Sequence, residues 1–255
     1  MSRIVKLGIS AAAAGLACAF CLPAHAVGIL NGGFEVGLSG WTRVDQVGSD
    51  GTFALQTGAA SPVNLDPVPA PPQGSTAAMS DAQGPGSHVL YQDFTVTGPV
   101  GPTTLNFSLF IGNRDSEFFV PSTLDFATPA LNQQARVDIL ASGMDPFSVA
   151  AADVLLNAYQ TLPGNALVSG YTSFSVDVAA LLNAHVGETL RLRFAEVDNV
   201  FTFQLGVDNV SFASSAAALP EPSSGALLTS LLLGLAWIGG RKRTLSGRQA
   251  AKACA

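Results

Sequence analysis

The sequence predicts an all-β fold, an antiparallel β-sandwich with one short helix. Between residues 27 and 218, apolar and polar side chains alternate with the period of a β-strand and not with the period of a helix. Glycine and proline separate the alternating runs, as they do at the turns between strands. Many short strands joined by turns, within the length of one domain, are typical of a sandwich.

The alternation is clearest in two segments. Residues 103–111 place four large apolar side chains on one face and two polar ones on the other, with Leu105, Phe107, Leu109 and Ile111 against Asn106 and Ser108. Residues 188–197 are divided in the same way, with Leu190, Leu192 and Phe194 against Arg191, Arg193 and Glu196. Further strands are predicted at Thr52–Thr57, His88–Val96, Ala135–Leu140, Tyr171–Val178, Phe201–Gly206 and Val207–Phe212.

One segment, Asp177–Gly187, favours a helix over a strand. Asp177 is a residue type preferred at the N-cap, and Gly187 is typical of the position that ends a helix. The predicted helix is therefore short and lies just before the strand at residues 188–197.

The first 26 residues have the pattern of a secretory signal peptide. Arg3 and Lys6 precede an apolar stretch, and Ala24-His25-Ala26 forms a small-x-small cleavage site. We therefore expect the mature chain to begin at Val27, after a cut that follows Ala26. Residues 27–218 contain no cysteine, so their core does not depend on disulfides.

The charge of the body excludes one class of partner. Residues 27–218 carry five arginines, no lysine and 17 acidic residues, which gives a net charge of −12. Affinity for nucleic acid and for anionic lipid comes mainly from Lys and Arg contacts to phosphates. We expect no nucleic-acid binding.

An uncharged segment near the C-terminus predicts a single membrane helix. Gly225–Gly240 contains 16 residues without a charge, which as a helix would measure about 24 Å, against roughly 30 Å for the hydrocarbon core of a bilayer. The basic cluster Arg241, Lys242 and Arg243 follows directly. By the positive-inside rule this cluster stays in the cytoplasm and leaves the body outside.

This terminal region resembles a known sorting signal. The order Pro220-Glu221-Pro222, apolar helix and basic cluster is similar to the PEP-CTERM signal of Gram-negative bacteria that make exopolysaccharide. The resemblance implies an exosortase-type membrane peptidase as a partner, a transient anchor in the inner membrane, removal of the tail, and a final place at the cell surface or in the extracellular matrix. The chain departs from the family pattern in residues 244–255, a cytoplasmic extension beyond the basic cluster. The expected organisation is thus 1–26 signal peptide, 27–218 sandwich, 219–243 sorting signal and 244–255 extension.

A second resemblance concerns the two ends of the body. The segments Asn31–Trp41 (NGGFEVGLSGW) and Gly206–Phe212 (GVDNVSF) look like the first and last strands of jelly-roll, galactose-binding-like domains, a group that includes many carbohydrate-binding modules. The resemblance implies that these two strands are neighbours and that a structural calcium lies there, held by Glu35 and Asp208. Calcium prefers several oxygen ligands, and two carboxylates in one place would otherwise repel each other. The alternative is that Glu35 makes a local cap or salt bridge and Asp208 a turn.

Two long connections are candidates for function. Residues 59–75 are proline-rich and predict a semi-extended loop, and residues 112–134 form a long connection. The second one brings together residue types that bind sugars, namely Asn113, Asp115, Glu117, Phe118 and Phe119. In the alternative interpretation its phenylalanines cover the core. Trp41 and Tyr91 are interpreted as packing residues.

The sequence shows no set of catalytic groups, and we do not expect an enzyme. Residues 27–218 lack the G-x-S-x-G and H-E-x-x-H motifs, a cysteine nucleophile and a Ser–His pair on one face. The leading hypothesis is an exported surface protein associated with extracellular polysaccharide, through carbohydrate binding. The alternatives are a structural matrix protein without a ligand site, and a secreted glycan hydrolase, since 17 acidic residues allow many carboxylate pairs.

Overall fold

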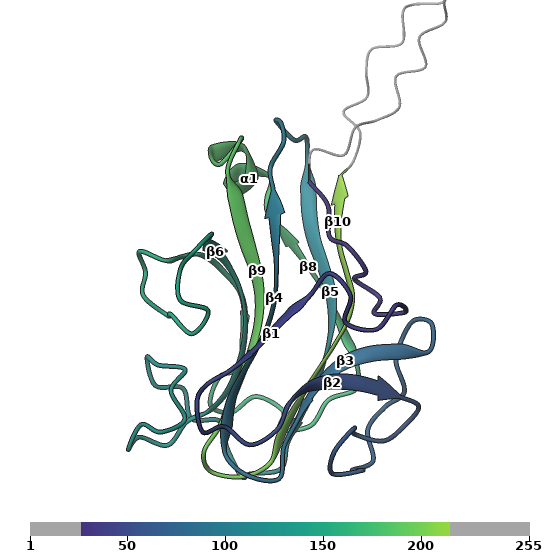
Figure 1. Ribbon diagram of the computed structural model, residues 1–255, viewed down its shortest axis with the longest axis vertical. Helices are drawn as coiled ribbons and strands as arrows, with labels where there is room; N and C mark the ends of the chain where they lie inside the picture. Colours follow the sequence, from purple (N-terminus) through teal and green to yellow (C-terminus); the bar gives the residue numbers. More distant parts are fainter. Residues whose placement is uncertain (1–26, 215–255) are drawn as a thin grey trace, which may run out of the picture.

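The computed structural model describes residues 27–214 and shows two five-stranded antiparallel sheets packed face to face (Figure 1). One sheet has the strand order β1-β4-β9-β6-β7 and the other has the order β2-β3-β10-β5-β8. The strands are β1 (Thr42–Asp45), β2 (Thr52–Thr57), β3 (Thr76–Asp81), β4 (Gly86–Thr95), β5 (Thr103–Asn113), β6 (Gln133–Ala141), β7 (Val154–Gln160), β8 (Thr172–Asp177), β9 (Thr189–Asp198) and β10 (Phe203–Ser214). The predicted antiparallel β-sandwich is confirmed.

The pairing of the last eight strands is nested. β3 pairs with β10, β4 with β9, β5 with β8, and β6 with β7. This order arises when a long antiparallel hairpin of four strand pairs folds over itself, which is the topology of a jelly roll. β1 and β2 extend the two sheets at their edges, β1 beside β4 and β2 beside β3.

The core fills the space between the two sheets. It is rich in aromatic rings. Phe107 and Trp41, for example, both contact Phe194, at ring-centroid distances of 5.9 and 5.8 Å. The four apolar side chains predicted to share one face of residues 103–111 all belong to it. Val27, at the first described position, is also buried in this core. Residues 27–214 thus hold a continuous core of their own.

β9 is buried on both faces, which differs from the half-buried strand that the alternation predicts. Leu192, Phe194 and Glu196 face the space between the sheets, whereas Arg191 and Arg193 face outward. The predicted placement of Glu196 beside the two arginines is wrong, because residues two apart share a face of a strand. The outer face is covered by the connection between β6 and β7, whose carbonyl groups accept hydrogen bonds from both arginines.

Smaller apolar clusters lie outside each sheet, under the long connections. Val89, Ala195 and Val197 are covered by Leu124 and Phe126 from the segment that joins β5 to β6. On the other sheet, Met79 and Phe110 are covered by Val68 of the proline-rich segment 59–75. Both long connections therefore fold onto the sandwich.

Three strands are absent from the sequence prediction. β1 has only four residues, and β3 is built mainly from small residues that show no alternation. β7 carries two adjacent leucines and pairs with β6 through two irregularities in register. The two strands predicted at Phe201–Gly206 and Val207–Phe212 are in fact one, β10, which bulges between Asp208 and Ser211.

The segment Asn31–Trp41 forms consecutive turns and not a strand. Asn31 and Phe34 both have positive φ angles, of 50° and 56°, which interrupt an extended backbone. The first strand, β1, begins after Trp41 and pairs with β4, so the predicted strand at Asn31–Trp41 is wrong. The turn segment nevertheless lies against β10, because the Val210 N–H donates to the Gly32 carbonyl at 2.9 Å. A Cβ on residue 32 would overlap the Val210 carbonyl, so glycine permits this close approach.

The predicted helix is confirmed in a shorter form, α1 (Ala179–Ala184). Val178 occupies the N-cap position, while Asp177 accepts a hydrogen bond from the Ala179 N–H at 2.9 Å. Gly187 has a φ of 89° and lies three residues beyond the helix. Asp177 is thus one residue too early to be the N-cap.

Several predicted features lie outside the described residues. These are the signal peptide with Ala26, the sorting motif, the apolar segment 225–240, the basic cluster and the extension 244–255. Within residues 27–214, no helix has the length and apolar character needed to cross a membrane.

Candidate functional site

The main candidate site is a pocket at one end of the sandwich, opposite the end that carries α1. Two turns form it, the turn between β3 and β4 and the turn between β9 and β10. Its volume is about 200 Å³, and its walls are Gln83, Gly84, Pro85, Asp198, Asn199, Val200, Phe201 and Thr202. These turns lie at the lower end of the strands in Figure 1. The size suits a single small cyclic group.

Phe201 gives the pocket an exposed aromatic wall. The residue is 59% exposed, although phenylalanine is usually buried. The turn beneath it is held firmly, because Gln133 donates to the Phe201 carbonyl at 2.6 Å. Asn199 adds three further bonds through its amide nitrogen, to the carbonyls of Phe126, Thr128 and Ala130. The ring is therefore presented on a rigid support.

Asp198 supplies the carboxylate of the pocket. It ends β9, and its Oδ1 accepts a hydrogen bond from the Gly86 N–H at 2.9 Å. Burial raises the pKa of Asp198 to about 7, against the lowering effects of the Gly86 N–H and of the nearby His88. The carboxyl group thus changes its charge near neutral pH.

A row of polar side chains lies between the sheets behind Asp198. His88 Nδ1 and Asp45 Oδ1 form a hydrogen bond of 2.8 Å. His88 lies directly opposite Glu196 on the neighbouring strand. His88 Nε2 and Glu196 Oε1 are both buried and lack a hydrogen-bond partner among residues 27–214. Burial and the charge of Asp198 raise the pKa of Glu196 well above its usual value. Both effects favour the neutral, protonated form of Glu196.

The five residues predicted to bind sugar are divided by the structure. Phe118 is buried and contacts Phe203, with ring centroids 5.8 Å apart, so it covers the core. Asn113 is buried and ties the connection together, donating to the Glu117 carbonyl and accepting from Asp115 and Gln133. Glu117 is exposed, whereas Asp115 and Phe119 are half-buried. Asn113 and Phe118 thus have packing roles, and a ligand contact by the other three stays a prediction.

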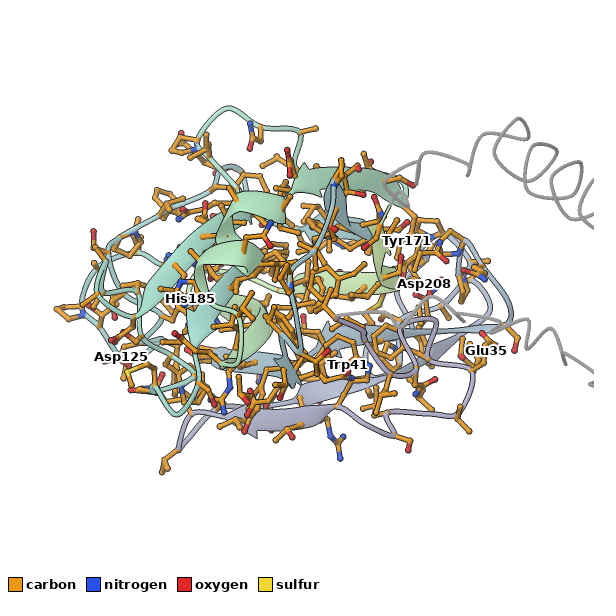
Figure 2. The ribbon with its side chains drawn as sticks, turned by 90° about the horizontal axis from the view of Figure 1, so that it is seen from above. Glu35, Trp41, Asp125, Tyr171, His185 and Asp208 are labelled. Carbon is orange, nitrogen blue, oxygen red and sulfur yellow. The ribbon has the colours of Figure 1, made fainter. Side chains whose placement is uncertain are left out.

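Glu35 and Asp208 form a second candidate site, on the side of the molecule seen at the right of Figure 2. Glu35 Oε1 accepts hydrogen bonds from the N–H groups of Ser75 and Thr76 at 2.9 and 3.0 Å. Asp208 is buried and accepts from the N–H groups of Asn209 and Gln73. The two acids are brought together by the contact between the turn at Gly32 and β10.

The electrostatics of this pair fit a cation. Burial raises the pKa of Asp208 to about 6, and the charge of Glu35 adds to the effect. Asp208 makes no ion pair within residues 27–214, and the hydroxyls of Ser75 and Thr76 lie beside Glu35. Calcium prefers such oxygen donors. The described part of the chain contains no cluster of three or more His, Cys, Asp and Glu side chains placed for a metal, so further ligands would be carbonyl or hydroxyl oxygens.

A shallower hollow of about 230 Å³ lies on the outer face of the other sheet, over β5 and β8. It is lined by uncharged residues, namely Asn106, Phe107, Ser108, Ser173, Phe174, Ser175 and Asn209. Ser108 and Ser173 face each other with their hydroxyls 3.3 Å apart. We assign no function to this hollow.

Comparison with known proteins gives a likeness of shape alone. No protein-family model and no curated protein matches this sequence. Among solved structures, the K3 cleaved adhesin domain of Lys-gingipain from Porphyromonas gingivalis w83 aligns with 74% of this chain and 99% of its own, at 14% identity and a TM-score of 0.43. The module TmCBM61, solved with β-1,4-galactotriose, aligns over 72% and 96% of the two chains, at 13% identity and a TM-score of 0.41. A cyclase from Fischerella sp. TAU aligns over 75% and 98%, at 19% identity and a TM-score of 0.43. At these values the likenesses carry no conclusion about what this chain binds or catalyses.

Proposed function

We propose that this protein is an exported β-sandwich that binds extracellular polysaccharide through the pocket beside Phe201. The observation that carries the proposal is the exposed Phe201 on the wall of a pocket between two turns. The protein acts in this account as a binding module and not as an enzyme.

The chemistry of the pocket suits a sugar ring. One face of a pyranose is formed by C–H groups and packs against an aromatic face, while its hydroxyls need hydrogen-bond partners. The pocket offers both, because Phe201 lies beside the amide of Gln83 and the carboxyl of Asp198. Loops placed on a rigid scaffold are common positions for such sites.

The rigidity of the pocket supports affinity. The bonds that Asn199 and Gln133 make to neighbouring carbonyls fix the turn before any ligand arrives. A site that is ordered in advance loses less conformational entropy on binding. A small pocket with one aromatic wall can then retain a sugar unit of a long chain, and repeated units raise the apparent affinity.

Affinity electrophoresis of the fragment 27–218 tests this function. We expect the wild-type fragment to be retarded in gels that contain the polysaccharide of its host, and Phe201→Ala to migrate as it does without polysaccharide. Val186→Ala is the matched control, because Val186 is an exposed apolar residue at the opposite end, beside α1. Unretarded wild-type protein would favour a purely structural role, and release of reducing ends would favour a hydrolase.

We also propose the cellular route that the sequence predicts. The signal peptide at 1–26, the motif Pro220-Glu221-Pro222 and the basic cluster at 241–243 support export, transient anchoring in the inner membrane and processing by an exosortase-type peptidase. Delivery to the cell surface or matrix would bring the pocket to extracellular polysaccharide. This route is independent of the ligand of the pocket.

We propose calcium as a structural cation at Glu35 and Asp208. The cation would neutralise two neighbouring carboxylates and join the turn at Gly32 to β10. Because it binds the folded state alone, stability should rise with free calcium, by about 2.7 kcal/mol at a hundredfold excess over Kd.

Thermal melting of the fragment 27–218 tests the calcium site. We expect calcium to raise the Tm by several degrees relative to chelator, and magnesium to have little effect because it demands a tighter octahedral shell. Glu35→Gln and Asp208→Asn should each remove the response to calcium. Equal responses to both ions, or a calcium response that survives both substitutions, would contradict the assignment.

A further inference from the structure

The charge of the pocket selects among sugars. Asp198 is the only ionisable side chain among the residues that line it. Asp198 makes no ion pair within the described part of the chain, and residues 27–218 contain no lysine. A desolvated carboxylate is unfavourable in its charged form unless a cation lies beside it. A ligand that brings a positive charge to Asp198 would therefore be stabilised.

The surroundings of the pocket add further negative charge. Asp50 accepts a hydrogen bond from the Gln83 N–H at 2.9 Å, at the rim of the pocket. On the inner side, Glu196 shares a strand face with Asp198 and is shifted toward its neutral form, so it supplies no cation to Asp198. Asp81 lies on the strand next to Ser80, which hydrogen-bonds Glu196.

The basic side chains nearby already have partners. Arg114 donates to Gln204 Oε1 at 3.3 Å and lies 3.9 Å from Asp66. His88, which faces Glu196, has its Nδ1 bonded to Asp45. An acidic sugar would therefore meet carboxylates without a free cation to pair with, and like charges in a partly desolvated site are strongly unfavourable.

From this geometry we infer that the pocket takes an amine-bearing sugar, a hexosamine whose nitrogen is not acetylated, with its ammonium group against Asp198 and its ring against Phe201. The inference rests on the proposed function, since it names the class of sugar for the same pocket. A protonated amine supplies the missing partner of Asp198 and donates charge-assisted hydrogen bonds to it. The aromatic wall contributes as well, because a cation is attracted to the face of a ring.

The test compares three short probes by isothermal titration calorimetry on the fragment 27–218, whose core is complete. The probes are a β-1,4-linked glucosamine tetramer, the same tetramer fully N-acetylated, and a galacturonic acid tetramer. At low salt we expect the amine probe to bind about tenfold to a hundredfold more tightly than the acetylated one, as for a hydrogen bond to a charged group, and the acidic probe not to bind. The advantage should shrink as salt rises.

Two variants locate the effect. Asp198→Asn should reduce the preference for the amine to less than about twofold and leave binding of the acetylated tetramer in place. Asp177→Asn is the matched control, because it removes an exposed acid at the α1 end and should leave the preference unchanged. Asp198→Asn is expected to fold, because it removes a buried carboxyl group whose ionised form destabilises the folded state near neutral pH.

The outcomes separate the two levels of the account. Equal binding of the three probes, tighter binding of the acidic probe, or an amine preference that survives Asp198→Asn would overturn the inference while the proposed function stands. An amine preference lost equally in Asp177→Asn would show attraction to the overall negative charge, and would also overturn it. If neither the probes nor the host polysaccharide binds, the proposed function fails and the inference fails with it.

Discussion

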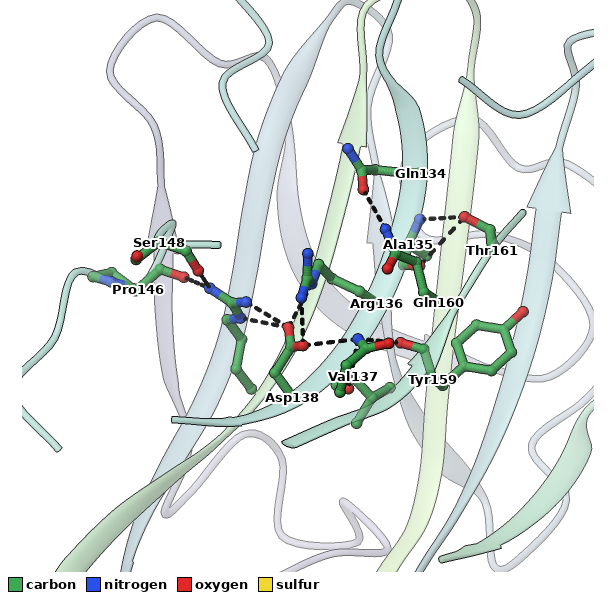
Figure 3. A network of polar contacts seen from close by, with 12 residues as sticks. Gln134, Ala135, Arg136, Val137, Asp138, Pro146, Ser148, Tyr159, Gln160 and Thr161 are labelled. Carbon is green, nitrogen blue, oxygen red and sulfur yellow. Dashed lines mark hydrogen bonds and ion pairs between the residues drawn. The ribbon is translucent and has the colours of Figure 1, made fainter. Parts of the chain in front are cut away.

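Asp138 is the shared counter-charge of two buried arginines (Figure 3). It is fully buried in β6 and lies between two guanidinium groups, those of Arg136 and Arg193. Arg193, also fully buried, continues to the carbonyls of Pro146 and Ser148 at 2.7 Å each. The network thus fastens the connection between β6 and β7 onto the outer face of the sheet.

We predict that Asp138→Asn destabilises the fold by about 3 to 5 kcal/mol, because it leaves two buried guanidinium groups without a counter-charge. Asp66→Asn is the matched control. Its ion pair with Arg114 is long, at 3.9 Å, and about a third exposed, so the loss should be about 1 kcal/mol or less. Urea unfolding of both variants measures the difference. Similar small losses would mean that Asp138 is not essential to the network.

We predict that ionisation of the Asp198 carboxyl group lowers the stability of the folded state as the pH rises. Its folded pKa, about 7, lies above its ordinary value of 3.8, so the folded state favours the protonated form. The stabilisation is complete below pH 3.8 and is lost as the pH rises through 7. Between pH 5 and 8, Asp198→Asn should therefore gain stability relative to wild type, by on the order of a few kcal/mol. Parallel pH profiles for the two proteins, from urea midpoints in chelator, would contradict this.

At the scale of elements, the sequence predicts strands whose side chains alternate and misses those that do not. Residues 52–57 are predicted with the bounds that β2 has, and the core face of β5 is predicted residue by residue. β3 is missed because TAAMSD has one large apolar residue, Met79, and therefore no alternation, although the strand is buried between two neighbouring strands. The burial of β9 is predicted wrongly, because Arg191 and Arg193 look like residues of a solvent-exposed face. In the structure the connection between β6 and β7 covers that face.

The candidate site is predictable only in part, for a similar reason. The sequence indicates the connection 112–134 as functional, and the structure places its carbonyls under the turn that carries Phe201. Gln83 and Phe201 themselves are 118 positions apart, on two turns that meet only when β4 pairs with β9. No local pattern marks such a pair. The sequence does indicate Glu35 and Asp208 as a pair, because each lies in one of the two segments that resemble the end strands of galactose-binding-like domains.

The turn at Gly32 gives the prediction that belongs to this scale. Gly32→Ala should destabilise the sandwich by about 2 kcal/mol or more, since an added Cβ would overlap the Val210 carbonyl on β10. Gly28→Ala is the control, because a Cβ there meets nothing within 4 Å. Thermal melts of the two variants decide the matter. Equal Tm values would show that the turn does not need its close approach to β10.

At the scale of the whole molecule, β10 links two ends of different character. It begins at Phe203, just after the pocket, and it ends at Ser214 beside the start of β5, at the α1 end in Figure 1. Twelve strand residues span about 40 Å. A chain attached beyond Ser214 would therefore hold the pocket at the far end, away from the attachment.

This arrangement suits the sorting proposed for the C-terminal segment. We predict that replacing Pro220-Glu221-Pro222 with alanines leaves export intact and retains the protein in the inner membrane, because the apolar segment and Arg241–Arg243 still anchor it. Cell fractionation with an antibody against the sandwich measures this. A triple variant that reaches the outside as the wild type does would show that the motif is not recognised.

The most direct test of carbohydrate binding at this pocket is an NMR titration of the fragment 27–218 with oligosaccharides cut from the host polysaccharide. We predict that the backbone signals of Gln83, Asn199 and Phe201 shift in proportion to occupancy, while those of α1 and of Ser173 on the outer face of β8 stay in place. Signals that stay unchanged around the pocket, or that shift mainly at the α1 end or over β8, would contradict the account.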